Sequence, residues 1–286
     1  MRVLTDPLLR TRVGHIQRRV PLPRVEGLAP DAIVVSHAHH DHLDPRSLRR
    51  VADGRPIIVP RGCAGILRRR GLKEIIEVGV GDRVAVGGLF IEAVPAVHDG
   101  RRYPGGRKRE ALGYVVEGPC SVYFAGDTDL FPKMEELAGR VDVAALPVWA
   151  WGPRTGAGHL DPARAARATA LIRPRIAIPI HWGTMAVVWA GHAADPTAPA
   201  RAFSSAVARL APASTCGFSR PETGPISSGA REPTDRRPQN PSRVRHQSPH
   251  DRCRAAFPGG FRRFDARRPF PVAARPPRGR APSWRS

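Results

Sequence analysis

The stretch VSHAHHDHLD, residues 35–44, holds four histidines and two aspartates within ten positions. It directly follows AIV, residues 32–34, an apolar run that is typical of a buried strand. Histidine is both a common metal ligand and a proton-transfer group near neutral pH. A strand that ends in such a stretch predicts a metal or catalytic site at the edge of a sheet.

The spacing inside the stretch, H-x-H-x-D-H, separates two pairs of donors. His37 and His39 are alternate residues, so they can point the same way and share one metal. Asp41 and His42 lie past the turn and can face a second metal beside the first. Imidazole and carboxylate ligands suit zinc, and also manganese or iron. Two metals need about seven protein ligands, so the pattern predicts further donors elsewhere in the chain.

Three further donors each follow an apolar run. His98 follows IEAVPAV, Asp127 follows SVYFAG and His181 follows IAIPI. Potential ligands at the ends of several strands can converge at one rim of a sheet. The sequence therefore predicts a metal site formed by His37, His39, Asp41, His42, His98, Asp127 and His181.

The rest of the chain up to residue 212 alternates short β-branched runs with helical patterns, which predicts mixed sheets flanked by helices. Strands are expected over residues 32–36, 56–60, 89–96, 112–117, 121–125, 141–147 and 175–180. Helices are expected over residues 45–53, 62–70, 132–138, 162–172 and 199–210. Asp44 and Asp161 each precede a proline, the pattern of a carboxylate N-cap followed by proline at the first helical position.

From about residue 4 to residue 210, the chain resembles the metallo-β-lactamase fold superfamily. The motifs TDPLLR, SHAHHDHLD, FAGDTD, GHLDP and HWGT resemble the branch of N-acyl-phosphatidylethanolamine phospholipase D and ascorbate-6-phosphate lactonase. The resemblance implies an α/β fold, the four-layer αββα sandwich, with its metals at one edge. Members usually carry two strands before the TDP segment, so it also implies that the first sheet lacks its opening strands.

The resemblance also implies roles for the donors. His37, His39 and His98 would bind the first of two divalent ions, Asp41, His42 and His181 the second, and Asp127 would bridge both. Zinc is the expected metal, with manganese and iron as alternatives.

A metal pair of this kind implies a hydrolase. A hydroxide shared by the two metals would attack a phosphodiester, a lactone or an amide. Asp41 would also orient this nucleophile. His159, in GHLDP, is interpreted either as a group for substrate contact or proton transfer, or as a helix-entry residue.

Residues 213–286 differ in composition from the domain predicted over residues 1–212. Proline, arginine, serine and glycine dominate them, with 16 Arg against 5 acidic residues, about half of the net charge of +21. Such a segment buries too little apolar area to offset its ordering entropy, so a disordered tail is expected. One hypothesis is that this tail is translated out of frame.

Two alternatives to a small-molecule hydrolase remain open from the sequence. The positive charge favours a nuclease acting on RNA or DNA, although much of it lies in the tail. A truncated, inactive relative is the other. The start MRVLTDPLLR has no apolar signal-peptide core, and no apolar run of 18 residues occurs, so we expect a cytoplasmic protein without a transmembrane segment that acts on a small-molecule or lipid-like substrate.

Overall fold

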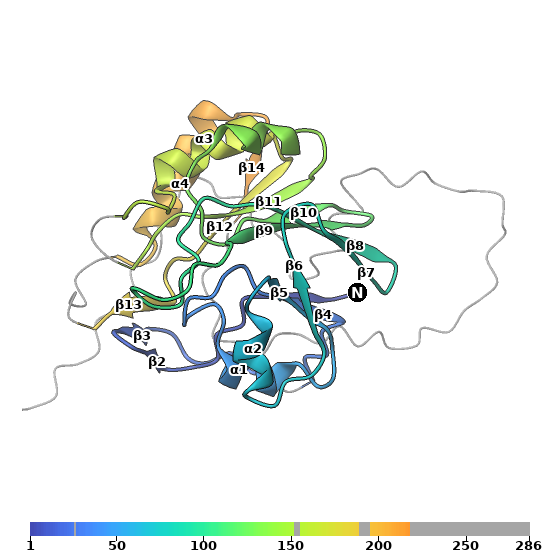
Figure 1. Cartoon of the computed structure of the whole chain (residues 1–286). Coiled ribbons are helices and arrows are strands. Elements are labelled where there is room, and N and C mark those ends of the chain that lie inside the picture. Colours follow the sequence, from blue (N-terminus) through green and yellow to red (C-terminus); the bar gives the residue numbers. More distant parts are fainter. Residues whose placement is uncertain (26, 152–154, 189–194, 218–286) are drawn as a thin grey trace, which may run out of the picture.

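The structure is a computed structural model that describes residues 1–25, 27–151, 155–188 and 195–217. Two sheets pack face to face, and each is covered on its outer side by helices (Figure 1). Helices α3 (Pro162–Ile172) and α4 (Ala198–Leu210) cover the larger sheet, and α1 (Pro45–Val51) and α2 (Ala64–Arg68) cover the smaller one. This four-layer αββα arrangement confirms the predicted fold class.

The smaller sheet is all parallel and has the order β1-β4-β5-β6. Its strands are β1 (Val3–Thr5), β4 (Ala32–Val34), β5 (Ile57–Pro60) and β6 (Ile75–Val78). Every residue of β4 and β5 is buried, as expected for parallel strands covered on both faces. Among the described residues, β1 is paired on one side only, with β4.

The larger sheet has seven strands in the order β14-β12-β11-β10-β9-β8-β7. They are β7 (Arg83–Val86), β8 (Leu89–Pro95), β9 (Leu112–Glu117), β10 (Val122–Phe124), β11 (Val143–Pro147), β12 (Ile176–Ile180) and β14 (Thr215–Cys216). Strands β7 to β10 form an antiparallel meander, whereas β10, β11, β12 and β14 run parallel. The β10-to-β12 half connects through helices, as parallel pairing requires.

Short elements complete the described chain. A three-stranded sheet joins β2 (Arg12–Val13), β3 (Ile16–Arg18) and β13 (Met185–Val187). The segment expected as a helix from Pro132 is the 3-10 helix η1 (Pro132–Leu137). Strand β14 lies just past residue 212, within the first residues of the predicted tail, and the tail from residue 218 lies outside the described residues.

The sheets place the predicted ligands at one edge. Buried Val34, Ile58, Tyr114 and Phe124 belong to one cluster that fills the space between the sheets. The chain leaves β4, β8, β10 and β12 at their carboxyl ends just before His37, His98, Asp127 and His181, respectively. Four strand ends from two packed sheets therefore meet at the same edge.

Candidate metal centre

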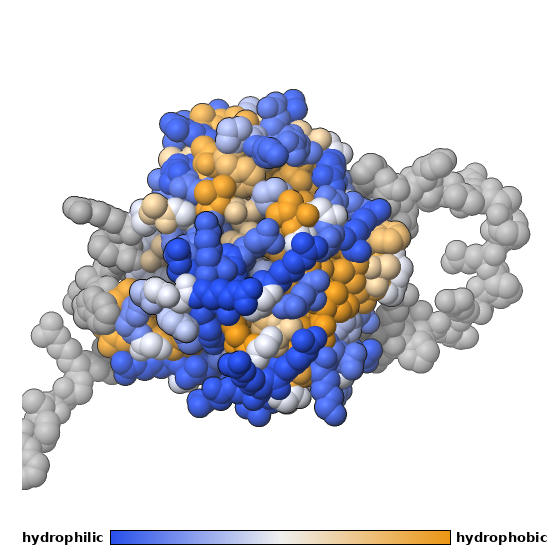
Figure 2. Space-filling view, viewed as in Figure 1, coloured by the Kyte–Doolittle hydropathy of each residue, from blue (hydrophilic) through white to orange (hydrophobic). Residues whose placement is uncertain are grey.

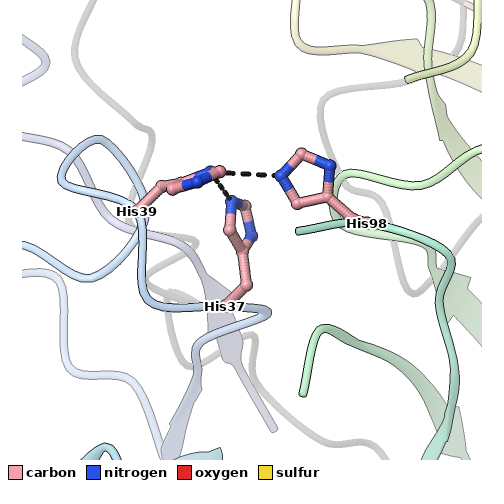
Figure 3. Close-up of side chains that lie close together, drawn as sticks. All are labelled: His37, His39 and His98. Carbon is pink, nitrogen blue, oxygen red and sulfur yellow. Dashed lines mark hydrogen bonds between the residues drawn. The ribbon is translucent and has the colours of Figure 1, made fainter. Parts of the chain in front are cut away.

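The imidazoles of His37, His39 and His98 point toward one another (Figure 3). His39 Nδ1 lies 2.8 Å from His37 Nε2 and 3.1 Å from His98 Nε2. Their ring nitrogens all lie within 4.8 Å of one another, so one cation can reach all three. His37 and His39 come from the loop after β4, and His98 comes from the loop after β8.

Two of these rings are held at their other nitrogen. His37 Nδ1 lies 2.9 Å from Ser36 Oγ, and His98 Nδ1 donates to the carbonyl of Gly158 at 2.8 Å. A hydrogen bond at one ring nitrogen fixes the tautomer and leaves the other nitrogen as the metal-facing lone pair. The Nε2 atoms of His37 and His98 are therefore oriented toward the cluster by the fold itself.

A second group joins Asp41, His42 and His181, whose donor atoms also lie within 4.8 Å of one another. His42 Nε2 lies 3.2 Å from Asp41 Oδ2, and the rings of His42 and His181 are stacked. His181 Nδ1 donates to the carbonyl of Trp149 at 2.6 Å, which turns Nε2 inward. His181 has a φ of 63°, a left-handed conformation that costs free energy for a non-glycine residue and often marks a functional site.

The carboxylate of Asp127 lies between the two groups and is 1% exposed. Its Oδ2 is 3.3 Å from His42 Nε2 and 4.0 Å from His37 Nε2, and its Oδ1 is 3.4 Å from His181 Nε2. One buried carboxylate thus faces histidines of both groups, the position that a bridging ligand needs.

His159 lies beside Asp127 and His98. Its Nε2 is 3.5 Å from Asp127 Oδ2, and its ring packs edge-on against His98 at 4.6 Å between centroids. With His98 and Asp127 it forms a further group of donors that one ion could reach. All eight predicted site residues therefore lie together at one edge of the sandwich, and their roles stay predictions.

Asp6 is part of this centre, although it was not among the predicted site residues. Its Oδ2 lies 2.6 Å from His42 Nδ1, and its carboxylate accepts from Ser36 N at 2.7 Å and Ser36 Oγ at 2.5 Å. Asp6 also has a positive φ, 39°. The TDP motif was the available signal, but its partner His42 is 36 positions away and no local pattern links the two.

The histidines divide into two electrostatic kinds. Burial lowers the pKa of His37, His39 and His98, and that of His98 falls to about 4. Burial also acts to lower the pKa of His42, but the carboxylates of Asp41, Asp127 and Asp6 outweigh it and raise this pKa well above its ordinary value. The first group is therefore neutral near pH 7, whereas His42 carries a proton when no metal is bound.

The carboxylates of Asp41 and Asp127 are ionised. Burial acts to raise the pKa of Asp127, but the imidazoles of His181 and His42 lower it well below its ordinary value. The pKa of Asp41 is lowered as well, because burial acts to raise it but the imidazole of His42 outweighs this effect. Two anionic carboxylates buried among histidines are a strong donor set for a divalent cation.

Several buried polar atoms of the centre lack a hydrogen-bond partner in the described structure. They are His42 Nε2, both carboxylate oxygens of Asp127, His159 Nδ1 and His181 Nε2. Buried polar groups without partners are costly and rare, so a set of them that faces one point calls for an explanation. A divalent cation would satisfy the inward-facing atoms, and the residues present therefore fit metal ions.

A cavity of about 1270 Å³ opens from this centre into the space between the sheets. Asp41, His42, Asp127 and His181 lie at its polar end. Its wall continues over apolar side chains of the larger sheet, which include Val122, Phe124, Ala145, Ile178 and Ile180. Trp151 and Trp182 line it as well.

Histidine and carboxylate donors at the edge of a four-layer αββα sandwich define a metal-dependent hydrolase of the metallo-β-lactamase superfamily. The family model described as "Beta-lactamase superfamily domain" matches residues 1–182. The chain therefore belongs to this family, and the predicted resemblance is confirmed.

Similar proteins agree with this membership. A UPF0173 metal-dependent hydrolase of Thermoplasma acidophilum is 31% identical over 192 residues, which cover 65% of this chain and 78% of that protein. N-acyl-phosphatidylethanolamine-hydrolyzing phospholipase D 1 of Caenorhabditis elegans is 32% identical over 211 residues, covering 64% of this chain and 59% of the relative. Among solved structures, Igni18, a metallo hydrolase of Ignicoccus hospitalis, superposes with a TM-score of 0.54 at 25% identity, covering 71% of this chain and 84% of its own.

Proposed function

We propose that the chain is a dinuclear hydrolase. His37, His39 and His98 would hold one divalent ion, Asp41, His42 and His181 would hold the other, and Asp127 lies where it could contact both. The observation that carries this proposal is the convergence of ligand atoms from four strand ends into two adjacent groups. Those of His42, Asp127 and His181 are buried and have no hydrogen-bond partner among the described residues. Zinc is the metal that this mixture of imidazole and carboxylate ligands suits best, and manganese or iron are the alternatives.

Two divalent ions at these positions supply Lewis acidity and lower the pKa of water toward neutrality. The chain's own residues do the rest. Asp41, anionic and beside His42, orients the nucleophile at the second group. The hydrogen bonds from His98 to Gly158 and from His181 to Trp149 hold the donors in place before substrate arrives.

His159 is proposed as the proton-transfer group. Burial acts to lower its pKa, but the neighbouring carboxylate of Asp127 raises it. An imidazole whose pKa is raised, at the edge of the donor cluster, can donate a proton to a leaving group. Its side chain is partly exposed beside Asp127, so contact with the substrate is proposed as well.

The cavity supports a small substrate with an apolar part. Polar donors occupy one end, and β-branched and aromatic side chains line the wall beyond. A phosphodiester, a lactone or an amide with an apolar group fits this division, and the relative from Caenorhabditis elegans is named for hydrolysis of an N-acyl phospholipid. This apolar wall favours a lipid-like or small organic substrate over the nuclease alternative.

The test replaces Asp127 by Asn, a change of equal size that removes the charge shared by both groups. We expect the purified wild-type chain to hold two equivalents of metal by elemental analysis, and Asp127→Asn to hold fewer and to lose turnover on a panel of phosphodiesters, lactones and amides. Asp82→Asn is the matched control, because Asp82 accepts from Gly79 and Arg61 far from the centre. Full metal content and undiminished turnover in Asp127→Asn would contradict the proposal.

A further inference from the structure

Arg102 lies in the segment after His98 and contacts the loop that carries the other donors. Its Nη1 donates to the carbonyl of Ala38 at 2.9 Å and to the carbonyl of Leu43 at 3.0 Å. Its Nη2 lies 3.1 Å from His40 Nδ1. One guanidinium therefore holds three points of the loop between residues 38 and 43.

The two carbonyls bracket the ligand positions. His39, Asp41 and His42 all lie between Ala38 and Leu43. Ala38 and Leu43 have no exposed surface, so their carbonyls face inward and need donors from the protein. Because the same Nη1 binds both, it fixes the distance between the two ends of the loop, and with it the spacing of the donors inside.

Arg102 also links the loop to the third donor of the first group. It follows His98 by four residues, so the segment that presents His98 is tied to the loop that presents His37 and His39. A planar guanidinium with donors in fixed directions suits this task better than the flexible ammonium of a lysine.

The charge of Arg102 forms no ion pair with an acidic group of the described residues. The guanidinium is half-buried, which lowers its pKa, although the charge of Asp44 acts in the opposite sense. A charge taken out of water without an ion pair is costly unless hydrogen bonds compensate. Here the compensating bonds all go to the metal-binding loop, which is what a positioning role requires.

We propose that Arg102 is a positioning residue that sets the metal affinity of the centre by fixing the loop of residues 38–43 against the segment of His98. The inference rests on the proposed metal site and names a determinant of it that touches no metal. Its neighbour Arg101 provides a control, because the Arg101 guanidinium is partly exposed and contacts Asp99 rather than the metal-binding loop.

The experiment uses the full chain as wild type, Arg102→Met, Arg102→Lys and Arg101→Met. Each is stripped of metal and titrated with Zn²⁺ against a chromophoric chelator. We expect the dissociation constant of Arg102→Met to rise about 10- to 100-fold, as for other residues that orient ligands, and that of Arg101→Met to stay at the wild-type value. Arg102→Lys should recover part of the loss, because its ammonium can still reach one or both carbonyls.

Two further readouts separate positioning from general damage. Hydrogen exchange of the metal-free proteins should quicken at residues 38–43 in Arg102→Met while the strands of both sheets keep wild-type protection. If Arg102→Met does not fold, the comparison of the Zn²⁺ dissociation constants of Arg102→Lys and Arg101→Met tests the inference instead. A wild-type dissociation constant in the Arg102 variants would overturn this inference and leave the metal site standing, whereas a wild-type chain that binds no Zn²⁺ would remove the proposed function itself.

Discussion

The carboxylate of Asp6 lies directly behind the donor cluster and acts on it through His42. Its contact with His42 Nδ1, together with two hydrogen bonds from Ser36, fixes which nitrogen of His42 faces Asp41 and Asp127. Carboxylate–histidine pairs of this kind raise the basicity of the ligand and set its orientation. The positive φ of Asp6 shows that the backbone is bent to bring this carboxylate into place.

Replacing Asp6 by Asn should weaken metal binding by about 10- to 100-fold. Asp6 uses both oxygens as acceptors, one for Ser36 N and the other for His42 and Ser36 Oγ, whereas Asn has a single acceptor oxygen. One of these contacts is therefore lost, and with the amide nitrogen facing His42 the ring would turn or change tautomer and present an N–H to the site. Asn tolerates the left-handed backbone, so the fold should persist. The measurement is a Zn²⁺ competition titration, with Asp31→Asn as control, since Asp31 accepts from Arg2 N away from the centre. Equal affinities in the two variants would show that Asp6 has no such role.

The sequence predicts most of the donors because each of them follows an apolar run. His98, Asp127 and His181 come directly after strands that can be recognised by composition alone. Asp6 and Arg102 could not be assigned in this way. Their partners lie 36 and 64 positions away, and two of the groups that Arg102 binds are backbone carbonyls, which have no sequence signature.

At the scale of elements, helix α1 begins where the metal-binding loop ends. Asp44 is its N-cap, and its side chain accepts from Ser47 N at 3.0 Å and from Ser47 Oγ at 2.6 Å. Ser47 Oγ in turn accepts from Leu9 N at 2.8 Å, which ties the segment after β1 to the helix. The cap therefore joins the loop, the helix and the N-terminal segment at one point.

Replacing Asp44 by Ala should lower the free energy of unfolding by about 1 kcal/mol. The helix has only seven residues, so its start depends strongly on this cap. Urea unfolding of the metal-free chain measures the effect. Asp161→Ala, which removes the equivalent cap of α3 where Asp161 accepts from Arg164 N, should cost a similar amount. An unchanged unfolding midpoint in Asp44→Ala would contradict the prediction.

The seven expected strands and five expected helices all occur, with η1 in 3-10 rather than α form. The remaining strands were not expected individually: β1, β2, β3, β6, β7, β13 and β14. Strands β1, β2, β3 and β13 have only two or three residues each. Their pairing is set by tertiary partners, as when β3 pairs with β13 from the opposite end of the domain, so local composition could not reveal them.

At the scale of the whole molecule, the buried histidines make the stability of the metal-free chain depend on pH. The folded-state pKa lies below the unfolded value for His37, His39 and His98. Between these two pKa values the unfolded chain binds more protons than the folded chain does. The folded chain therefore loses stability as the pH falls from about 6.5, the unfolded pKa, toward the folded-state pKa values, which is about 4 for His98. The raised pKa of His42 acts in the opposite sense, with stability present below about 6.5 and lost as the pH rises through the folded pKa.

We therefore expect the metal-free chain to be most stable near pH 6.5 and to weaken on both sides. Denaturant midpoints between pH 4 and pH 9 measure this, after metal removal by a chelator that is then dialysed away. In His98→Gln the loss on the acid side should become shallower, because one of the lowered groups is gone. A midpoint that is constant from pH 4 to pH 6.5 would contradict the burial of neutral histidines.

No helix in the described part of the chain is long and apolar enough to cross a membrane. The cytoplasmic location stays a prediction. About half of the net charge falls in residues 213–286, nearly all of which lie outside the described residues, so the charge alone does not assign a nucleic-acid partner.

The two sheets differ in width, and this difference affects self-association of the protein in solution. Within the described residues the narrow sheet ends at β1, while Ile178 and Ile180 of β12 in the wide sheet line the cavity and are partly exposed. On the face drawn in Figure 2, hydrophobic residues form patches among hydrophilic ones. A strand edge that has no hydrogen-bonded neighbour in the described structure, next to apolar side chains, is a surface with which a strand of another chain can pair. We therefore expect the protein to form oligomers at high concentration. Dilution, or a lysine introduced on β1, should restore the monomer.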